Sequence, residues 1–426
     1  MQKLLRFIQI INKLFHSNNQ SVIDTILSSL GITIFLAIAL LLTTGFFFET
    51  AQHFYYLSLS FLHGKLYLIQ LPLTDSSPLS DLVLFNNHYY WALGPFPSIL
   101  LLPFVYLATL INIPFWQGYL NFFLVIGVVY FIFILSRLQQ YSKRDSFFLS
   151  LAFMSSIFLG AALLPSSYHF AHVITVFLLL AILIEYLTRK KYWLIGLFLS
   201  FILATRLPAS FAIIFFIIQI FFDNKSTKKE KTNNIIQLMI FPLIMGLLLM
   251  LYNYLRFYNI FEFGYSYQIL IIDAVAKARE YGMFNLIHLP GNLFYLLLSP
   301  PTPIFKDGLS HILQFPYLKG NNWGMSIFFT SPILIYLFKF KYKDIISITL
   351  LITTLVISLP ILLYYGIGYW QFGYRYSLDF LPLLFFLFIY KYNNQYGNLT
   401  KGIKILILSS ALINIYLFAS LLHYPL

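Results

Sequence analysis

Long runs of hydrophobic residues alternate with short polar segments along most of the chain. An apolar run of about 18 residues or more is long enough to cross the roughly 30 Å hydrocarbon core of a bilayer as an α-helix. The apolar runs fall at 26–48, 95–112, 117–138, 147–164, 171–188, 192–204, 208–222, 235–252, 325–340, 345–363, 377–390 and 403–421. This pattern predicts an all-α polytopic membrane protein.

The run at 95–112 determines the orientation of every later run. It contains Pro95, Pro97 and Pro103 and follows the aromatic stretch NHYYW at 87–91, which fits a short bent helix at the membrane surface better than a straight span. If this run does not cross and the N-terminus is cytoplasmic, 19 of the 27 Lys and Arg residues lie inside, against 10 if it crosses. Because Lys and Arg concentrate on the cytoplasmic side, we favour the surface helix and about eleven transmembrane helices. An ordinary span at this position is the alternative.

This orientation places two long loops, 49–116 and 253–324, on the outer face and leaves only short loops inside. It divides the chain into an N-terminal transmembrane module over 1–252, which includes the first outer loop, the second outer loop over 253–324, and C-terminal transmembrane helices over 325–426. Eight of the nine histidines also fall on the outer side. We therefore expect the functional face to point outward.

Interfacial helices are expected at three places outside the apolar runs. In the first outer loop, His53 and Tyr56 share one helical face and Gly64 follows as a C-cap, which predicts a helix lying half in lipid. A second helix is expected over 273–280, with a solvated charged stripe. The N-terminal stretch 1–15 has a basic side and an apolar side, typical of a third.

Composition excludes several classes of function. Hydrophobic residues make up 60% of the chain and charged residues 10%. The formal net charge of +13 comes from Lys and Arg that mostly flank the apolar runs, so it signals membrane topology and indicates no nucleic-acid partner. The absence of cysteine excludes disulfides, thiolate catalysis and Cys-based metal sites. The hydrophobic composition and the flanking Lys and Arg residues therefore indicate that membrane lipids surround the protein.

Acidic residues of the first outer loop are candidates for chemistry. Glu49 follows the first apolar run directly, where a carboxylate is costly unless it is hydrated or used. Asp81 follows in the stretch LTDSSPLSDLVLFNNHYYW, whereas Asp75 of the same stretch fits a turn. His169 and His172 in SSYHFAHV have a spacing that suits a metal, but no third ligand is identified, which favours an interfacial pair.

Three arginines lie near the predicted outer ends of apolar runs. Arg206 in LATRLP and Arg375 in GYWQFGYRYSLD can each hold a lipid phosphate through paired hydrogen bonds. The alternatives are a snorkelling side chain for Arg206 and an i,i+4 pair with Asp379 for Arg375. Arg256 lies with Glu262 among aromatic residues just outside a span.

No nucleotide-binding motif is visible, because the chain contains neither GxxxxGK[ST] nor a GxGxxG sequence after a strand. An outward-facing site has no cytosolic ATP or nucleotide sugar available to it. A substrate must then arrive already activated, and a lipid carrier is the natural one at a membrane surface.

The order of these stretches resembles the GT-C class of integral-membrane glycosyltransferases, in particular its bacterial branch of protein-mannosyltransferase-like and aminoarabinose-transferase-like enzymes. The resemblance lies in a first span followed by FFFETAQHFYYLSLSFLHGKLYL, then DLVLFNNHYYWALGPFPSILLLPF, LATRLP, YNYLRFYNIFEFGYSY and GYWQFGYRYSLDFLPLL. It covers most of the chain through loose motifs. It departs from the class at SSYHFAHV, where members often carry an acidic residue.

This resemblance implies an inverting transfer of a sugar from a polyprenyl-phosphate donor to a hydroxyl or amine acceptor. It also implies a location in the bacterial cytoplasmic membrane, with the active face outward. Glu49 would take the acceptor proton, and Asp81 would be a second acidic partner that orients the acceptor or a divalent cation. The donor phosphate would bind Arg375, Arg256 and Arg206. The candidate acceptor-binding residues are His53, Tyr89, Tyr90, Trp91, Glu262 and Trp370.

Two other functions are compatible with an outward-facing polytopic protein. A lipid or glycan transporter, such as a flippase, would place polar residues at mid-span along a path, and the span centres here are largely apolar. An O-antigen-type polymerase or ligase would also use lipid-linked sugars, and the loop at 253–324 is compatible with it. The acidic first outer loop favours the glycosyltransferase. The sugar, the acceptor and the oligomeric state are not readable from the sequence.

Overall fold

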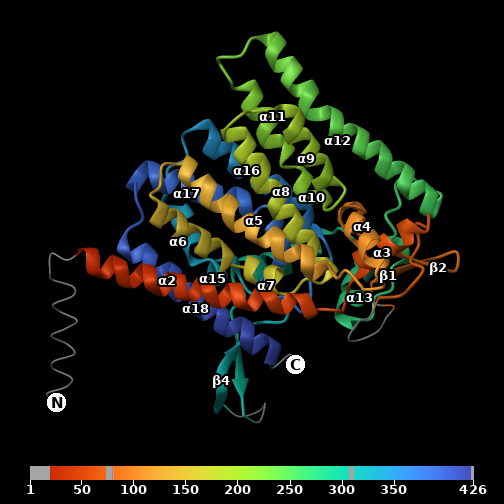
Figure 1. The fold of residues 1–426 in the computed structure, drawn as a ribbon, viewed down its shortest axis with the longest axis horizontal. Coiled ribbons are helices and arrows are strands. Elements are labelled where there is room, and N and C mark those ends of the chain that lie inside the picture. Colours follow the sequence, from red (N-terminus) through yellow and green to blue (C-terminus); the bar gives the residue numbers. More distant parts are fainter. Residues whose placement is uncertain (1–19, 73–78, 80, 307–310, 424–426) are drawn as a thin grey trace.

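The computed structural model describes residues 20–72, 79, 81–306 and 311–423. The expected N-terminal interfacial helix over 1–15 and the expected turn at Asp75 lie outside the described residues. Helices dominate the rest, and the chain is an all-α polytopic membrane protein, as the apolar runs predicted (Figure 1).

Six of the described helices are long and apolar enough to cross a membrane. They are α2 (Gln20–Leu42, continued by the 3-10 turn η1, Thr43–Phe47), α5 (Gln117–Leu138), α8 (Ser167–Leu187), α12 (Lys228–Phe257), α16 (Ile345–Leu363) and α18 (Lys401–His423). Each coincides with an apolar run of the sequence. The expected total of about eleven transmembrane helices stays a prediction, because the remaining runs form shorter helices.

The shorter helices fill the gaps between the long ones. They are α3 (His53–Leu62), α4 (Phe96–Thr109), α6 (Lys143–Met154), α7 (Phe158–Leu163), α9 (Tyr192–Leu203), α10 (Leu207–Ser210), α11 (Ile213–Phe221), η2 (Tyr265–Tyr267), α13 (Asp273–Glu280), η3 (Leu286–His288), α14 (Leu289–Leu297), α15 (Ile327–Thr330), η4 (Pro332–Lys339), η5 (Arg375–Asp379) and α17 (Leu381–Tyr396). The runs at 147–164, 208–222 and 325–340 are each broken in two. The last break falls at Ser331, which has a non-helical backbone (φ −139°, ψ 66°) and precedes Pro332.

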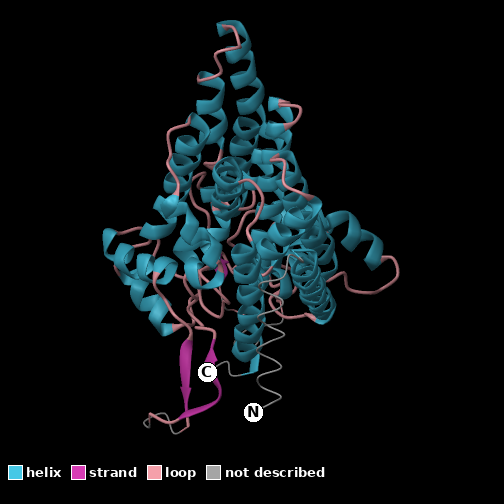
Figure 2. Ribbon diagram, turned by 90° about the vertical axis from the view of Figure 1, so that its left-hand side faces the viewer, coloured by secondary structure: helices cyan, strands magenta, loops and turns pink. Residues whose placement is uncertain are grey.

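Two short antiparallel hairpins interrupt the helical pattern, and the sequence analysis did not predict either. In the first, β1 (Leu82–Phe85) pairs with β2 (His88–Trp91) across Asn86 and Asn87, whose φ angles are 47° and 60°. Asparagine tolerates the left-handed region that a two-residue hairpin turn requires. The second joins β3 (Thr302–Phe305) to β4 (Leu313–Lys319) and projects from one end of the molecule (Figure 2).

Helix α8 lies in the centre of the bundle, where α5, α9 and α17 pack around it (Figure 1). Its side chains are almost all buried, including Phe170, Val173 and Leu180. Helix α12, by contrast, packs mainly against α9 and presents a long exposed apolar face that includes Leu247 and Leu251. Such a face suits contact with lipid acyl chains.

An ion-pair cluster ties together α2, α6 and α18 at their predicted cytoplasmic ends. The Lys404 ammonium lies 3.0 Å from a carboxylate oxygen of Asp145 and 3.8 Å from one of Asp24, and Arg144 lies 3.5 Å from Asp24. Asp145 also accepts a hydrogen bond from the backbone N–H of Leu399 at 3.1 Å. Because Lys404 and Asp145 are nearly inaccessible, each needs the other to compensate its charge.

The surface helix of the first outer loop differs from the expectation. Helix α3 begins at His53 and ends with Gly64 at φ +66°, as predicted, but residues 53–60 are all buried by protein. The half-in-lipid interpretation was therefore wrong: helix α4 and strand β2 cover α3. Helix α4 has 14 residues, about 21 Å of helix, and its placement at the membrane surface stays a prediction, because α9, which is an expected span, is even shorter.

Candidate functional site

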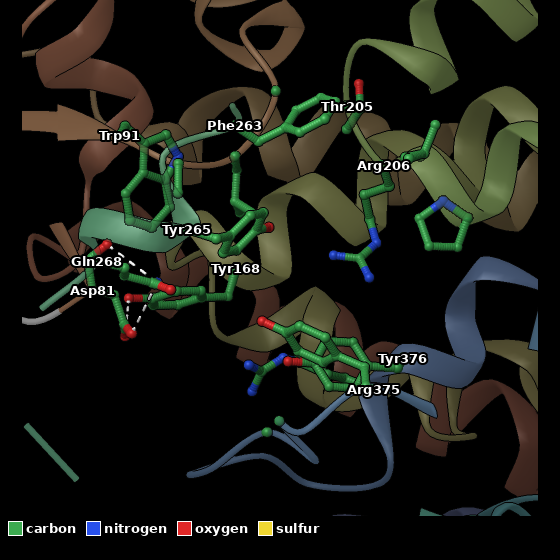
Figure 3. Close-up of a pocket in the computed structure, with 18 of the residues that line it drawn as sticks. Asp81, Trp91, Tyr168, Thr205, Arg206, Phe263, Tyr265, Gln268, Arg375 and Tyr376 are labelled. Atoms are coloured by element: carbon green, nitrogen blue, oxygen red, sulfur yellow. Dashed lines mark hydrogen bonds between the residues drawn. The ribbon is translucent and has the colours of Figure 1, made fainter. Parts of the chain in front are cut away.

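A cavity of about 540 Å³ opens among the ends of several helices (Figure 3). Its walls come from the end of the first span, the β2–α4 connection, the start of α8, the α9–α10 junction, the end of α12, the 263–284 segment and the α16–η5 connection. The charge count placed every one of these segments on the same side of the membrane. The structure brings them together, so their relative sidedness agrees with that prediction.

Asp81 supplies a carboxylate to this cavity. It precedes β1 with φ 61°, and its backbone N–H donates to the carbonyl of Ile269 at 2.9 Å. The Tyr168 hydroxyl donates to Oδ2 of Asp81 at 2.8 Å, and the Gln268 amide approaches Oδ1 at 3.4 Å (Figure 3). A tyrosine from α8 and a glutamine from the second outer loop thus orient one carboxylate of the first outer loop.

Arg375 enters the same cavity from η5. Its guanidinium lies 5.6 Å from the centre of the Tyr168 ring and 5.2 Å from that of Tyr376, and Nη1 donates to the Tyr369 carbonyl at 3.2 Å. Within the described residues, no carboxylate comes within 4.0 Å of this guanidinium, and its buried Nε has no hydrogen-bond partner. The alternative for Arg375, an i,i+4 pair with Asp379, is therefore not formed. Arg375 retains capacity to bind an anion.

Arg206 pairs with Asp379, the residue that was the alternative partner of Arg375. Its Nε and Nη2 donate to the two oxygens of Asp379 at 2.6 and 2.9 Å, a bidentate pair between the α9–α10 junction and η5. His172 lies on the same carboxylate, with Nδ1 3.2 Å from Oδ1. The Arg206 side chain is only 11% exposed, so the snorkelling alternative was wrong. Arg206 lines the cavity with its charge already compensated.

Arg256 approaches the cavity from the end of α12. Nη1 donates to the Trp91 carbonyl at 3.0 Å, Nη2 donates to Asn253 at 2.9 Å, and the guanidinium packs 3.9 Å from the centre of the Tyr252 ring. This contact holds the transmembrane helix against strand β2. The side chain is 3% exposed, so its charge is shielded from water.

Aromatic rings form much of the remaining wall. Trp91 is buried between the cavity and His53, whose ring stacks on it with centroids 3.9 Å apart. Burial lowers the pKa of His53 to about 3, against a smaller upward contribution from the Ala51 backbone, so this ring is neutral near pH 7. Burial likewise raises the pKa of Tyr265 to about 12. The wall is therefore uncharged apart from Asp81 and the arginines.

The structure gathers about half of the candidate residues. Asp81, Trp91, Arg206, Arg256, Trp370 and Arg375 line the cavity. Glu49, His53, Tyr89, Tyr90 and Glu262 do not.

Each of the residues outside the lining has another placement. The Glu49 side chain is exposed, between the lining residues Phe48 and Thr50, so the expectation that it shares a site with Asp81 is not met. Glu262 accepts hydrogen bonds from the backbone of the turn at Gly264 and Ser266. His53 lies behind Trp91, and Tyr89 and Tyr90 belong to strand β2, on which Tyr90 packs against Phe257 of α12.

Sequence reasoning missed the groups that orient these charges. Tyr168, Gln268 and the η5 residues Tyr376 and Asp379 come from three separate parts of the chain, and no local pattern links Tyr168 and Gln268 to Asp81 or Asp379 to Arg206. The tyrosine-rich composition of the outer stretches was the available signal. It shows where aromatic walls are possible, but not which ring faces which charge.

The described residues offer no cluster of ligands for a divalent cation. Among the residues that the structure describes, no three His, Asp or Glu side chains come together as a metal site. His169 instead pairs with the Ser166 hydroxyl at 2.8 Å, and His172 pairs with Asp379. These donor groups do not fit a metal, so we route no chemical step through one.

The fold and the cavity define a multi-pass helical membrane protein with a charged, aromatic-lined cavity where several helix ends meet. No protein-family model matches the sequence, and no curated protein matches it. Two solved structures are similar in fold. One is the apo oligosaccharyltransferase of Archaeoglobus fulgidus, and the other is the oligosaccharyltransferase AglB of that organism in complex with an inhibitory peptide and a dolichol-phosphate.

Both matches have a TM-score of 0.45 and 12% sequence identity. They cover 92% of this chain but only 55% of the archaeal one, so the chain spans little more than half the length of the structures it matches.

Proposed function

We propose that this protein is a membrane glycosyltransferase that moves a sugar from a polyprenyl-phosphate donor to a hydroxyl or amine acceptor, with inversion, on the outer face of the membrane. One observation carries the proposal. The cavity holds an arginine, Arg375, that no carboxylate of the described residues compensates, and Tyr168 bridges it to the carboxylate of Asp81. Arg375 and Asp81 thus lie on opposite sides of the Tyr168 ring. A base that takes a proton from the acceptor and a cation that binds the released phosphate suit a glycosyl transfer.

Arg375 would bind the phosphate of the donor. A lipid phosphodiester carries one negative charge, and the lipid phosphate released by transfer carries up to two. A cation at this position is therefore more strongly attracted to the leaving group than to the donor, which favours the transition state. Trp91 and His169 also line this cavity, and the buried Trp91 Nε1 and His169 Nε2 lack hydrogen-bond partners within the described chain.

Asp81 would act as the general base. The acceptor oxygen forms a bond to the anomeric carbon of the sugar, the bond from that carbon to the phosphate oxygen breaks, and the acceptor proton moves to Asp81. The electron pair of the broken bond stays on the lipid phosphate. Attack from the face opposite the phosphate inverts the anomeric configuration. The Tyr168 hydroxyl holds Oδ2 in place and leaves Oδ1 towards Gln268.

This assignment gives the acid–base step to Asp81, whereas the sequence alone favoured Glu49. Asp81 lines the cavity and Glu49 is exposed outside its lining, and a base must come within hydrogen-bond reach of the proton it takes. The two assignments predict different variants to be inactive, so one experiment separates them.

The first test measures binding of undecaprenyl phosphate to the full chain in lipid nanodiscs. Because Arg375 contributes a charge-assisted contact, we expect Arg375→Ala to weaken binding by about tenfold or more. Arg137→Ala is the matched control, since this exposed arginine lies in the last turn of α5, outside the cavity lining, and its guanidinium donates to the Tyr141 carbonyl. Equal binding by wild type and Arg375→Ala would overturn the phosphate site.

The second test follows the turnover of a sugar-bearing undecaprenyl phosphate by Asp81→Asn and Glu49→Gln. We expect Asp81→Asn to lose a factor of about 100 or more while still binding undecaprenyl phosphate, because the amide cannot take a proton. Glu49→Gln should remain within a few-fold of wild type. The reverse result would return the base to Glu49.

A further inference from the structure

A second chamber of about 340 Å³ lies beside the main cavity. It is enclosed by α13, by η3 and α14, and by the segments around Trp323 and Tyr365. The side chains that matter for its chemistry are Val275, Ile287, Tyr295, Trp323, Tyr365 and Ile367. None of the candidate residues taken from the sequence falls in it.

Two side chains separate the chamber from the main cavity. Val275 and Tyr365 line both spaces. Tyr365 is held firmly, because it is buried and its backbone N–H donates to the Met283 carbonyl at 3.1 Å. Trp323 of the chamber in turn contacts Tyr369 of the cavity wall, with ring centroids 4.8 Å apart. The chamber thus adjoins the proposed catalytic cavity, and the side chains of Val275 and Tyr365 lie between the two spaces.

The chamber is built for an uncharged ligand. No Lys, Arg, Asp or Glu is part of its lining. Its Asn292 is already satisfied, since Nδ2 donates to the carbonyls of Leu362 and Tyr364 and Oδ1 accepts from the Tyr374 hydroxyl. The His288 ring is likewise bonded to the Gly282 carbonyl at 2.9 Å. What remains is a set of aromatic and aliphatic faces.

Those faces suit a neutral pyranose ring. One face of such a ring presents C–H groups that pack on an indole or phenol ring, while its hydroxyls stay in water at the rim. Trp323, Tyr295 and Tyr365 supply three aromatic walls. Helix α13, which forms the outer side of the chamber, has no buried residue, so a ligand can enter beside it.

We propose that this chamber is a subsite for a neutral saccharide unit, which it holds next to the reacting centre across Val275 and Tyr365. The inference rests on the proposed transferase function. The same chemistry can come from two sources: a saccharide acceptor, or the sugar portion of the donor. The main cavity then takes the charged lipid phosphate and the chamber takes an uncharged sugar, so the two spaces differ in ligand class.

The test fills the chamber without touching the main cavity. Gly291, in the first turn of α14, lines the chamber and has no atom within 4 Å of an added Cβ. Gly246, on the exposed face of α12, has equally open surroundings and serves as the matched control. Maltotriose is titrated against the full chain in nanodiscs and followed by saturation-transfer NMR. We expect saturable binding to wild type and Gly246→Phe, and binding at least about tenfold weaker to Gly291→Phe.

Two results would overturn the subsite: no saturable maltotriose binding to wild type, or equal binding to wild type and Gly291→Phe. Retained undecaprenyl phosphate binding by Gly291→Phe shows that the variant is folded. The undecaprenyl phosphate titration tests the proposed function, and the maltotriose titration tests the subsite. Failure of one proposal is therefore distinguishable from failure of the other.

A competition experiment identifies the source of the sugar. If sugar-bearing undecaprenyl phosphate displaces maltotriose while bare undecaprenyl phosphate does not, the chamber holds the sugar portion of the donor. If maltotriose binds together with either lipid, the chamber holds the acceptor. Both results support a saccharide subsite, and they assign it to different substrates.

Discussion

Two arginines of the same cavity have different electrostatic states. Arg206 forms a bidentate pair with Asp379, which also contacts His172, whereas the Arg375 guanidinium has only carbonyl and aromatic contacts among the described residues. A buried arginine that is already paired contributes mainly to holding its helices together, because its charge is compensated. An arginine without a carboxylate can gain more from an incoming phosphate. The difference explains why Arg375 is the better candidate for substrate contact.

His53 makes stability depend on pH in a predictable direction. Its pKa of about 3 lies below the ordinary value of 6.5, so the unfolded chain binds a proton between these values that the folded chain does not. The contribution of neutral His53 to the free energy of unfolding is fully present above about pH 6.5, and it is lost as the pH falls towards 3. At pH 5 the loss amounts to about 2 kcal/mol. We expect the thermal unfolding midpoint in nanodiscs to be lower at pH 5 than at pH 7.5.

The control is His53→Phe, which keeps a ring against Trp91 but cannot take up a proton. Its midpoint should fall less between pH 7.5 and pH 5 than that of wild type. An identical fall in both proteins would mean that His53 is not the source of the acid sensitivity.

Among the elements, the long helices were the most predictable. Leu, Ile and Phe in uninterrupted runs define α5, α8 and α16, because only an internally hydrogen-bonded helix can cross hydrocarbon. The breaks were harder to foresee, since the serines at 155 and 156 separate α6 from α7 inside a run that remains apolar.

The hairpin at β1 and β2 had a signal that was overlooked. Asn86 and Asn87 between LVLF and HYYW favour a two-residue turn. The convergence of Asp81 with Tyr168 and Arg375 had no such signal. Asp81 and Tyr168 are separated by 87 positions, and Tyr168 and Arg375 lie on different elements. Only the folded bundle brings the three residues together.

The ion-pair cluster that joins α2, α6 and α18 can be tested by removing its buried cation. Lys404→Met leaves Asp145 buried without its cation, which costs about 3–5 kcal/mol for a broken buried pair. We expect a lower thermal unfolding midpoint, with undecaprenyl phosphate binding preserved at temperatures below the transition.

The double variant Lys404→Met/Asp145→Asn removes both charges and should recover part of the loss, because no uncompensated charge remains. If the double variant is as unstable as Lys404→Met alone, the loss comes from packing of the lysine stem and the electrostatic account is wrong.

On the scale of the whole molecule, sidedness decides whether the proposed chemistry is extracellular. All segments that line the cavity lie at one end of the bundle, and the positive-inside count assigns that end to the outside. The protein has no cysteine, so single cysteines can report on this directly. We expect a membrane-impermeant maleimide to label Lys277→Cys in intact cells.

Lys190→Cys, in the loop after α8, should react only after the membrane is opened. Both lysines are exposed in the structure, so access to the reagent is the only difference between the two sites. Labelling with the opposite preference would invert the orientation and place the cavity in the cytoplasm.

Helix α12 links this cavity to the thickness of the surrounding bilayer. The helix has 30 residues, and its apolar run 235–252 covers about 27 Å, close to the hydrocarbon core of about 30 Å. Its exposed apolar face suits contact with lipid, and its last turn carries Arg256, which is bonded to Trp91 in the cavity wall. A change of hydrophobic mismatch alters the tilt that such a helix adopts. We expect lipids of different acyl length to change the tilt of α12 and thereby the affinity of the cavity for the donor. The bilayer would then regulate the protein as well as surround it.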